Sequence, residues 1–147
     1  MMAGIAGIVM MFSMQSFRNP QLPGGSTWEA PASANAIKNP YAADEAAAAV
    51  TGKKIFTQYC VACHGNSGKG DGIAAVSLNP RPADFLLTPI VKESDGALFW
   101  KMTNGKSPMP AWGSILKPEQ RWQIVCYIRQ IEEKYAKVKP AQFTGTK

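Results

Sequence analysis

The sequence predicts an all-α fold for the main part of its 147 residues. No segment alternates convincingly between polar and apolar residues with the period of two that a half-buried β-strand requires. An alanine-rich stretch with few helix breakers covers residues 46–59, and a helical apolar pattern follows Pro118. We therefore expect one helical domain with a long helix near each of its ends.

The first expected helix spans residues 46–59. Gly52 and Phe56 lie four positions apart, so they share one face of this helix. A glycine on a packing face allows another helix to approach closely. We expect this face to pack against a second helix.

A shorter helix is expected over residues 95–104. Ser94 precedes it and is a suitable N-cap, because its hydroxyl can accept a hydrogen bond from the first turn. Gly105 follows it and is typical of the residue that ends a helix. Both boundaries of this element are therefore predicted by local chemistry.

The last helix is expected to begin at Pro118, since proline is favoured at the first helical position. Glu119 complements the positive N-terminus. Trp122 and Cys126 lie on a second apolar stripe. This stripe is covered by the N-terminal extension, by another subunit or, as we favour, by a wider buried face in which Cys126 is a small hydrophobic residue. The main apolar face follows i, i+3, i+4, i+7 spacing at Ile124, Tyr127, Ile128 and Ile131.

Cys60, Cys63 and His64 form a C-x-x-C-H pentapeptide, the pattern by which a chain attaches a c-type haem covalently. Two thiols at this spacing can add to the vinyl groups of one porphyrin, and the adjacent imidazole then ligates the iron. A structural zinc site needs four ligands, whereas the chain offers only Cys126 and no histidine outside the motif. A redox dithiol is expected in a strand-rich setting. The motif therefore predicts one covalently attached haem c.

The sixth iron ligand is not a second histidine of this chain, because His64 is the only one. Met102 falls in the expected helix 95–104, where methionine usually fills the core. Met109 lies between Pro108 and Pro110, which stiffen an extended loop and lower the entropic cost of holding its thioether toward a metal. The sequence favours Met109 over Met102.

Four short motifs stand in order along the middle of the chain. They are C-x-x-C-H-G at residues 60–65, G-x-G-D-G at 68–72, P-x-P-A-D-F at 80–85 and M-P-A-W at 109–112. Together they resemble a bacterial, membrane-associated class I mono-haem c-type cytochrome, of the kind found as subunits of respiratory complexes. The resemblance covers about residues 48–135.

The resemblance implies a cytochrome c fold, in which three to five helices surround one haem c and the first and last helices cross. It places Gly52 and Phe56 against Tyr127 at that crossing. It also implies that a proline carbonyl from the segment 80–82 accepts a hydrogen bond from the proximal imidazole. The candidate haem-binding residues are Cys60, Cys63, His64 and Met109, with Arg81 and Trp100 as propionate partners unless they are a surface arginine and a core tryptophan.

Four segments are expected. Residues 1–17 are strongly apolar and form either an uncleaved membrane anchor, which the missing positive charge and cleavage site favour, or a cleaved signal. Residues 18–47 are a Pro/Gly/Ala-rich irregular linker, residues 48–137 the haem domain, and residues 138–147 a basic tail. The resemblance implies that haem is attached outside the cytoplasm. Either form of the N-terminus therefore puts the domain on the extracytoplasmic (periplasmic) side, anchored or soluble.

The formal net charge of +6 is carried by scattered lysines rather than by a basic helix. It indicates steering toward acidic redox partners and not nucleic-acid binding.

No convincing catalytic set is present, so we expect an electron-transfer protein without a small-molecule substrate, serving as a membrane-tethered carrier or a subunit of a respiratory complex. Two alternatives stay open: a haem enzyme or gas sensor with an open sixth position, and a mainly structural haem subunit.

Overall fold

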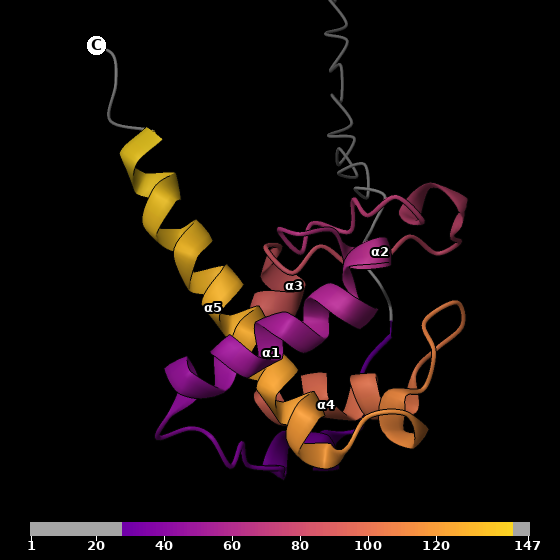
Figure 1. Ribbon diagram of the computed structural model, residues 1–147, viewed down its shortest axis with the longest axis vertical. Coiled ribbons are helices and arrows are strands. Elements are labelled where there is room, and N and C mark those ends of the chain that lie inside the picture. Colours follow the sequence, from indigo (N-terminus) through magenta and orange to yellow (C-terminus); the bar gives the residue numbers. More distant parts are fainter. Residues whose placement is uncertain (1–27, 143–147) are drawn as a thin grey trace, which may run out of the picture.

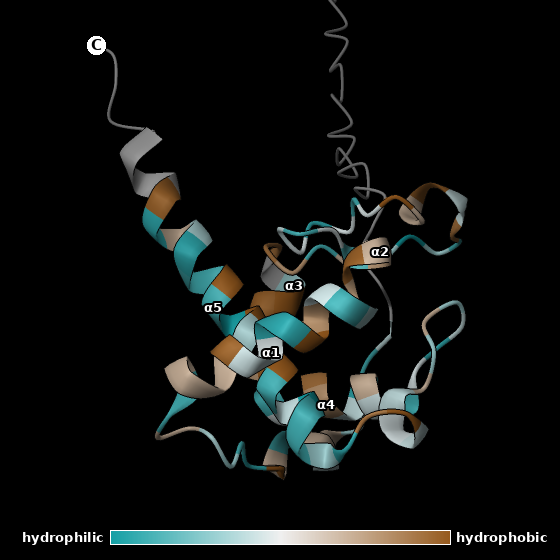
Figure 2. Cartoon of the chain, in the orientation of Figure 1, coloured by the Kyte–Doolittle hydropathy of each residue, from teal (hydrophilic) through white to brown (hydrophobic). Residues whose placement is uncertain are grey.

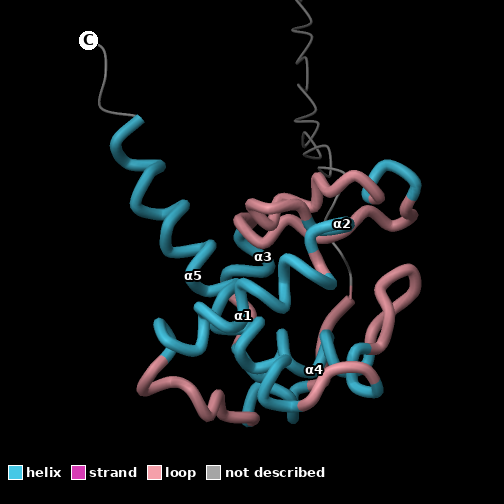
Figure 3. Tube along the Cα trace, in the orientation of Figure 1, coloured by secondary structure: helices cyan, strands magenta, loops and turns pink. Residues whose placement is uncertain are grey.

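The computed structural model describes residues 28–142, which form helices joined by loops and contain no strand (Figures 1 and 3). The predicted all-α fold is therefore confirmed. Three single 3-10 turns are η1 (Ala32–Ala36), η2 (Ala75–Ser77) and η3 (Trp112–Ser114). The α-helices are α1 (Glu45–Tyr59), α2 (Val61–His64), α3 (Thr88–Val91), α4 (Asp95–Asn104) and α5 (Pro118–Gln142).

The two long helices, α1 and α5, cross in close contact (Figure 1). A β-carbon placed on Gly52 would lie only 1.8 Å from the carbonyl oxygen of Gln123, so glycine sets the distance between the two backbones. One turn further along, the rings of Phe56 and Tyr127 meet edge to face with centroids 5.3 Å apart. The expected packing of Gly52 and Phe56 against the last helix is confirmed.

The hydrophobic core gathers around this crossing, where α1, α3 and α5 meet (Figure 2). Phe56, Ile124, Val125 and Cys126 are its largest fully buried side chains. The ring of Phe85, from the loop before α3, packs against Phe56 with centroids 6.2 Å apart. The core therefore reaches from the crossing into the loops that follow α2.

Helix α4 has the predicted boundaries. The Ser94 hydroxyl accepts a hydrogen bond from the Ala97 N–H (3.1 Å), and Gly105 ends the helix with a φ of 62°, a conformation that glycine adopts without strain. The ring of Phe99 stacks on that of Trp122 with centroids 4.2 Å apart. This contact fixes the α4 face against the start of α5.

Residues 28–44, here called the strap, lie against α4 and α5 within the segment that we expected to be a linker. A β-carbon on Gly96 would lie 2.1 Å from the Ala34 carbonyl oxygen, so the strap touches the α4 backbone. The Asn39 amide donates hydrogen bonds to the Asp95 carboxylate (2.9 Å) and to the Cys126 sulfur (3.6 Å). The second apolar stripe of α5 is thus covered at Cys126, which is 1% exposed, by the N-terminal extension.

The far end of α5 projects away from the other helices (Figure 1) and continues to Gln142, into the segment 138–147 that we expected to be a tail. None of the helices between residues 28 and 142 combines the length and hydrophobicity that a membrane span needs. The expected anchor at residues 1–17 lies outside the described residues.

We expect Gly52→Ala to lower the free energy of unfolding by about 2–3 kcal/mol, because the added methyl group must push α1 away from Gln123. This loss outweighs the gain of about 1 kcal/mol in helix propensity. Thr51→Ala, at the exposed neighbouring position, is the matched control and should change stability by less than about 0.5 kcal/mol. Denaturant unfolding measures both, and an unchanged or more stable Gly52→Ala protein would show that the crossing is not this tight.

Candidate functional site

The pentapeptide occupies the turn directly after α1. Cys60 caps the end of α1 and leads into the single turn of α2. The N–H groups of Cys63 and His64 both donate to the Cys60 carbonyl, at 3.1 and 2.9 Å. Both cysteines are free and half-buried. Residues 60–64, here called the attachment turn, therefore bring two thiols and one imidazole together on a single helical turn.

A glycine-rich loop over residues 65–74 caps the attachment turn. The last carbonyl groups of a helix have no hydrogen-bond partners within the helix. Here the N–H groups of the loop donate to them. A β-carbon on Gly72 would lie 2.3 Å from the Ala62 carbonyl oxygen, so the loop can approach this closely only at a glycine. The backbone pairs are Gly70 N–H to His64 (3.0 Å), Gly72 N–H to Cys63 (3.1 Å) and Ala74 N–H to Ala62 (2.8 Å).

The His64 imidazole is held against the core rather than in solvent. Its ring stacks on Phe85 with centroids 4.7 Å apart and an interplanar angle of 22°. Desolvation lowers the pKa of His64, and the backbone of Ala83 opposes this shift. The Nδ1 atom is nevertheless buried and forms no hydrogen bond with a described residue. Burial thus favours the neutral imidazole, the form that ligates iron.

The backbone of Ala83, the residue after Pro82, raises the pKa of His64 and so opposes the effect of burial. A hydrogen bond from the imidazole to a proline carbonyl of the segment 80–82 stays a prediction. The peptide bond before Pro80 is cis.

The environment of the Cys60 thiol differs from that of a redox-active nucleophile. Burial, together with the neighbouring Cys63, raises the pKa of Cys60 to about 12. A dithiol that exchanges with disulfides needs the opposite shift, since the thiolate is its nucleophile. The environment of the attachment turn therefore agrees with the sequence argument against a thioredoxin-like site.

The two candidate methionines lie in the settings that the sequence indicated. Met102 is 6% exposed and belongs to the core on α4. Met109 is half-buried in the loop before η3 and packs against the same core as Cys60 and Val61. Its N–H donates to the Lys106 carbonyl (2.8 Å) and its carbonyl accepts from the Lys106 N–H (3.1 Å), so a tight turn fixes its position in the loop. Which methionine ligates the iron stays a prediction.

The remaining candidates, Arg81 and Trp100, are placed on different elements. Arg81 is exposed in the loop between η2 and α3. Trp100 is half-buried on α4, and its ring lies 6.4 Å from that of Trp28 in the strap. The neighbouring Lys101 is buried, pairs with Glu93 and lies over the Trp28 ring. Contact of Arg81 and Trp100 with haem propionates stays a prediction.

Two aromatic contacts at the site were not predicted from the sequence. Phe85 stacks on His64, and Tyr59 meets Trp112 edge to face with ring centroids 5.6 Å apart. Phe85 and Trp112 each end one of the four motifs, which is the signal that points to them. Tyr59 carries no such signal beyond its position before Cys60.

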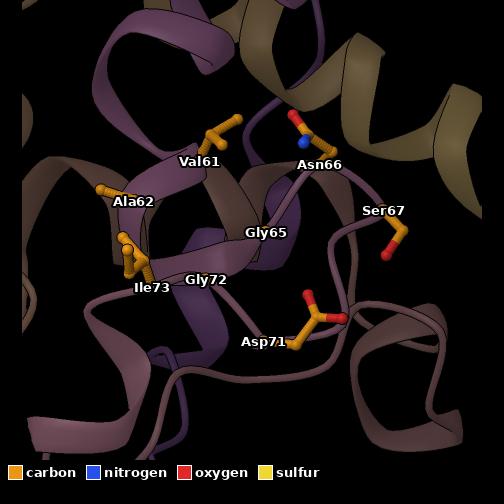
Figure 4. Close-up of a pocket in the computed structure, with 8 residues that line it drawn as sticks. All are labelled: Val61, Ala62, Gly65, Asn66, Ser67, Asp71, Gly72 and Ile73. Carbon is orange, nitrogen blue, oxygen red and sulfur yellow. The ribbon is translucent and has the colours of Figure 1, made fainter.

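An open hollow of about 420 Å³ lies between α2 and the glycine-rich loop. Figure 4 shows the apolar side chains of Val61, Ala62 and Ile73 at one side of it, with polar side chains at the other. Ile73 is 90% exposed, and Val76 on η2 is 73% exposed. An apolar surface of this kind beside the attachment turn is suited to contact with another protein.

The donor set fits a covalently bound haem. Two thiols stand three positions apart on one capped turn, and the neighbouring imidazole is buried, favoured as neutral and unpartnered at Nδ1. A thioether at Met109 packs against the same core. Such residues can attach a porphyrin and ligate its iron from two sides.

The comparisons with known proteins point the same way. The family model described as cytochrome c oxidase, cbb3-type, subunit III matches residues 47–128. Among curated proteins, cytochrome c6 of Anabaena variabilis is 38% identical over 79 residues, which cover 54% of this chain and 86% of that protein.

Two further relatives are parts of larger proteins or assemblies. The cbb3-type cytochrome c oxidase subunit FixP of Bradyrhizobium sp. is 32% identical over 87 residues, covering 56% of this chain and 27% of that subunit. A chain of the reducing HAO-like protein complex of Kuenenia stuttgartiensis has a similar structure, with a TM-score of 0.53 and 27% identity. That match covers 58% of this chain and 44% of the other.

We expect the double variant Cys60→Ala/Cys63→Ala to lose most of its helical circular dichroism signal when it is made in a host that matures c-type cytochromes. A domain of this size buries only a modest apolar core, so the haem must supply much of its stability. Cys126→Ala removes a buried thiol outside the attachment turn and should keep both haem and helices. A haem-free double variant with undiminished helical signal would contradict this expectation.

Proposed function

The chain belongs to the cytochrome c family described as cbb3-type cytochrome c oxidase subunit III, and from this premise we propose that it passes single electrons between respiratory redox proteins at a membrane. Its relatives make it a class I mono-haem c-type cytochrome, and electron transfer is the activity of such proteins. It is an electron-transfer protein rather than an enzyme. The observation that carries the proposal is the capped turn that presents two thiols beside an imidazole packed against the core.

In this proposal Cys60 and Cys63 would hold one haem c through thioether bonds, and His64 and Met109 would ligate its iron. When bound, the haem supplies an iron that changes its charge by one electron. A methionine thioether favours the reduced iron and raises the potential. The stacking of His64 on Phe85 and the capping of its carbonyl by Gly70 keep the proximal ligand in place in both states.

The partner surface that we propose is the apolar area formed by Ala62, Ile73 and Val76 beside the attachment turn. All three are exposed, and Ile73 is almost entirely so. Electrons leave a buried cofactor most easily where the polypeptide over it is thin, and the attachment turn is the segment bonded to the haem. The positive net charge then steers acidic partners, while the apolar area provides the contact.

The membrane attachment and the partners belong to the same proposal. The apolar residues 1–17 anchor the chain to the extracytoplasmic (periplasmic) face of the cytoplasmic membrane, or act as a signal that is removed. Similarity to FixP and to a chain of an HAO-like complex supports a role as a subunit of a redox complex. The strap, which is folded onto α4 and α5, limits how far the haem domain can move from such an anchor.

Carbon monoxide binding to the reduced protein tests the axial ligand. The wild-type protein should bind it slowly or not at all, because Met109 occupies the sixth position. Met109→Leu should bind it rapidly and lose the weak sulfur-to-iron absorption band at the red end of the spectrum. Met102→Leu conserves volume in the core and should retain the band. Fast binding by the wild-type protein would instead favour an open-site sensor or enzyme, and loss of the band only in Met102→Leu would transfer the ligand role.

Ile73→Glu tests the partner surface. A carboxylate in the apolar area should slow oxidation of the reduced protein by respiratory membranes of the native host, on the order of threefold to tenfold at low salt. The control is Val50→Glu, which is 60% exposed on α1 well before the attachment turn. Stopped-flow absorbance measures both rates. Equal rates for Ile73→Glu and Val50→Glu would place the docking surface elsewhere.

A further inference from the structure

We propose that the rings of Tyr59 and Trp112 form a clasp that positions the Met109 loop on the attachment turn and so restrains exchange of the sixth iron ligand. The Met109 loop comprises residues 105–114. The inference rests on the proposed ligation of the iron by Met109, and it assigns the two aromatic residues as positioning residues. Neither of them is itself a ligand.

The Met109 loop has a fixed shape of its own. Gly105 has a φ of +62°, and a β-carbon there would lie 2.5 Å from the Ala111 nitrogen, so the two ends of the loop are in contact. The backbones of Lys106 and Met109 exchange two hydrogen bonds, at 3.1 and 2.8 Å. At the far end, a β-carbon on Gly113 would lie 2.9 Å from a carbonyl oxygen on α4. The loop is therefore a single hydrogen-bonded unit in close contact with α4.

The attachment turn contacts a different part of the molecule. Its carbonyl groups are capped by the loop 65–74, and His64 rests on Phe85. No hydrogen bond between described residues joins the Met109 loop to α1 or α2. The direct contact between the two ligand-bearing units is therefore apolar.

The contact between Tyr59 and Trp112 joins the α1 end of the attachment turn directly to the Met109 loop. Tyr59 is the last residue of α1, directly before Cys60, and Trp112 is three residues after Met109. Their centroids are 5.6 Å apart at 65°, within the range in which aromatic pairs attract each other. Tyr59 is 37% exposed, so the pair lies at the protein surface. The rings thus link the two units at the protein surface.

The size of the effect follows from the strength of such a pair. An external ligand binds only to the fraction of molecules in which the thioether has left the iron, so its apparent affinity rises in proportion to that fraction. Loss of one edge-to-face aromatic contact should raise this fraction on the order of twofold to tenfold. The sulfur-to-iron band should weaken in the same variants.

The experiment titrates the oxidised holoprotein with imidazole and records the sulfur-to-iron band. Tyr59→Ala and Trp112→Ala should each raise the apparent imidazole affinity on the order of twofold to tenfold. The double variant should gain little beyond the larger single effect, because both substitutions remove one contact. Tyr59→Phe keeps the ring and should behave as wild type. Tyr135→Ala is the matched control, since Tyr135 is 39% exposed on the projecting end of α5.

The outcomes separate this inference from the proposed ligation. An intact wild-type band with unchanged imidazole affinity in Tyr59→Ala and Trp112→Ala overturns the clasp and leaves Met109 ligation standing. A wild-type protein without the band overturns both. Effects of Tyr59→Ala and Trp112→Ala that simply add in the double variant also overturn the clasp. If Trp112→Ala does not accumulate as folded holoprotein, Tyr59→Ala decides the question alone, because its partly exposed ring leaves no core cavity.

Discussion

The close crossing of α1 and α5 is the constraint on which the rest of the structure depends. Because Gly52 lets the backbones approach, Phe56 reaches Tyr127 and fills the core at the crossing. Phe85, from the loop before α3, packs on Phe56 and also stacks on His64. The position of the His64 imidazole is thus set by a series of ring contacts that begins at a glycine.

The site consists of two separately built units. Backbone hydrogen bonds from the glycine-rich loop fix the attachment turn, whereas a tight turn and contacts with α4 fix the Met109 loop. In the proposed ligation, a haem bonded to both units would join them and restrict their movement relative to each other. Such a restriction, together with an apolar surface beside the attachment turn, suits the proposed electron transfer.

The parts that could be predicted from the sequence are those with a local or periodic cause. Ser94 and Gly105 bound α4 through chemistry within a few residues, and the attachment turn follows from covalent spacing. Coverage of α5 by the N-terminal extension was only one of three alternatives, because the bond from Asn39 to Asp95 joins residues 56 positions apart and leaves no periodic pattern that would favour it. The contact between Tyr59 and Trp112 leaves no such pattern either, since only the tertiary structure brings the two rings together.

The central claim is that haem is bonded covalently to the two cysteines of the attachment turn. The most direct measurement is the mass of the polypeptide after maturation, denaturation and extraction with acidified acetone, which removes haem that is not covalently held. The account predicts a coloured polypeptide whose mass exceeds that of its amino acids by one haem. A colourless polypeptide with the mass of its amino acids alone would contradict it.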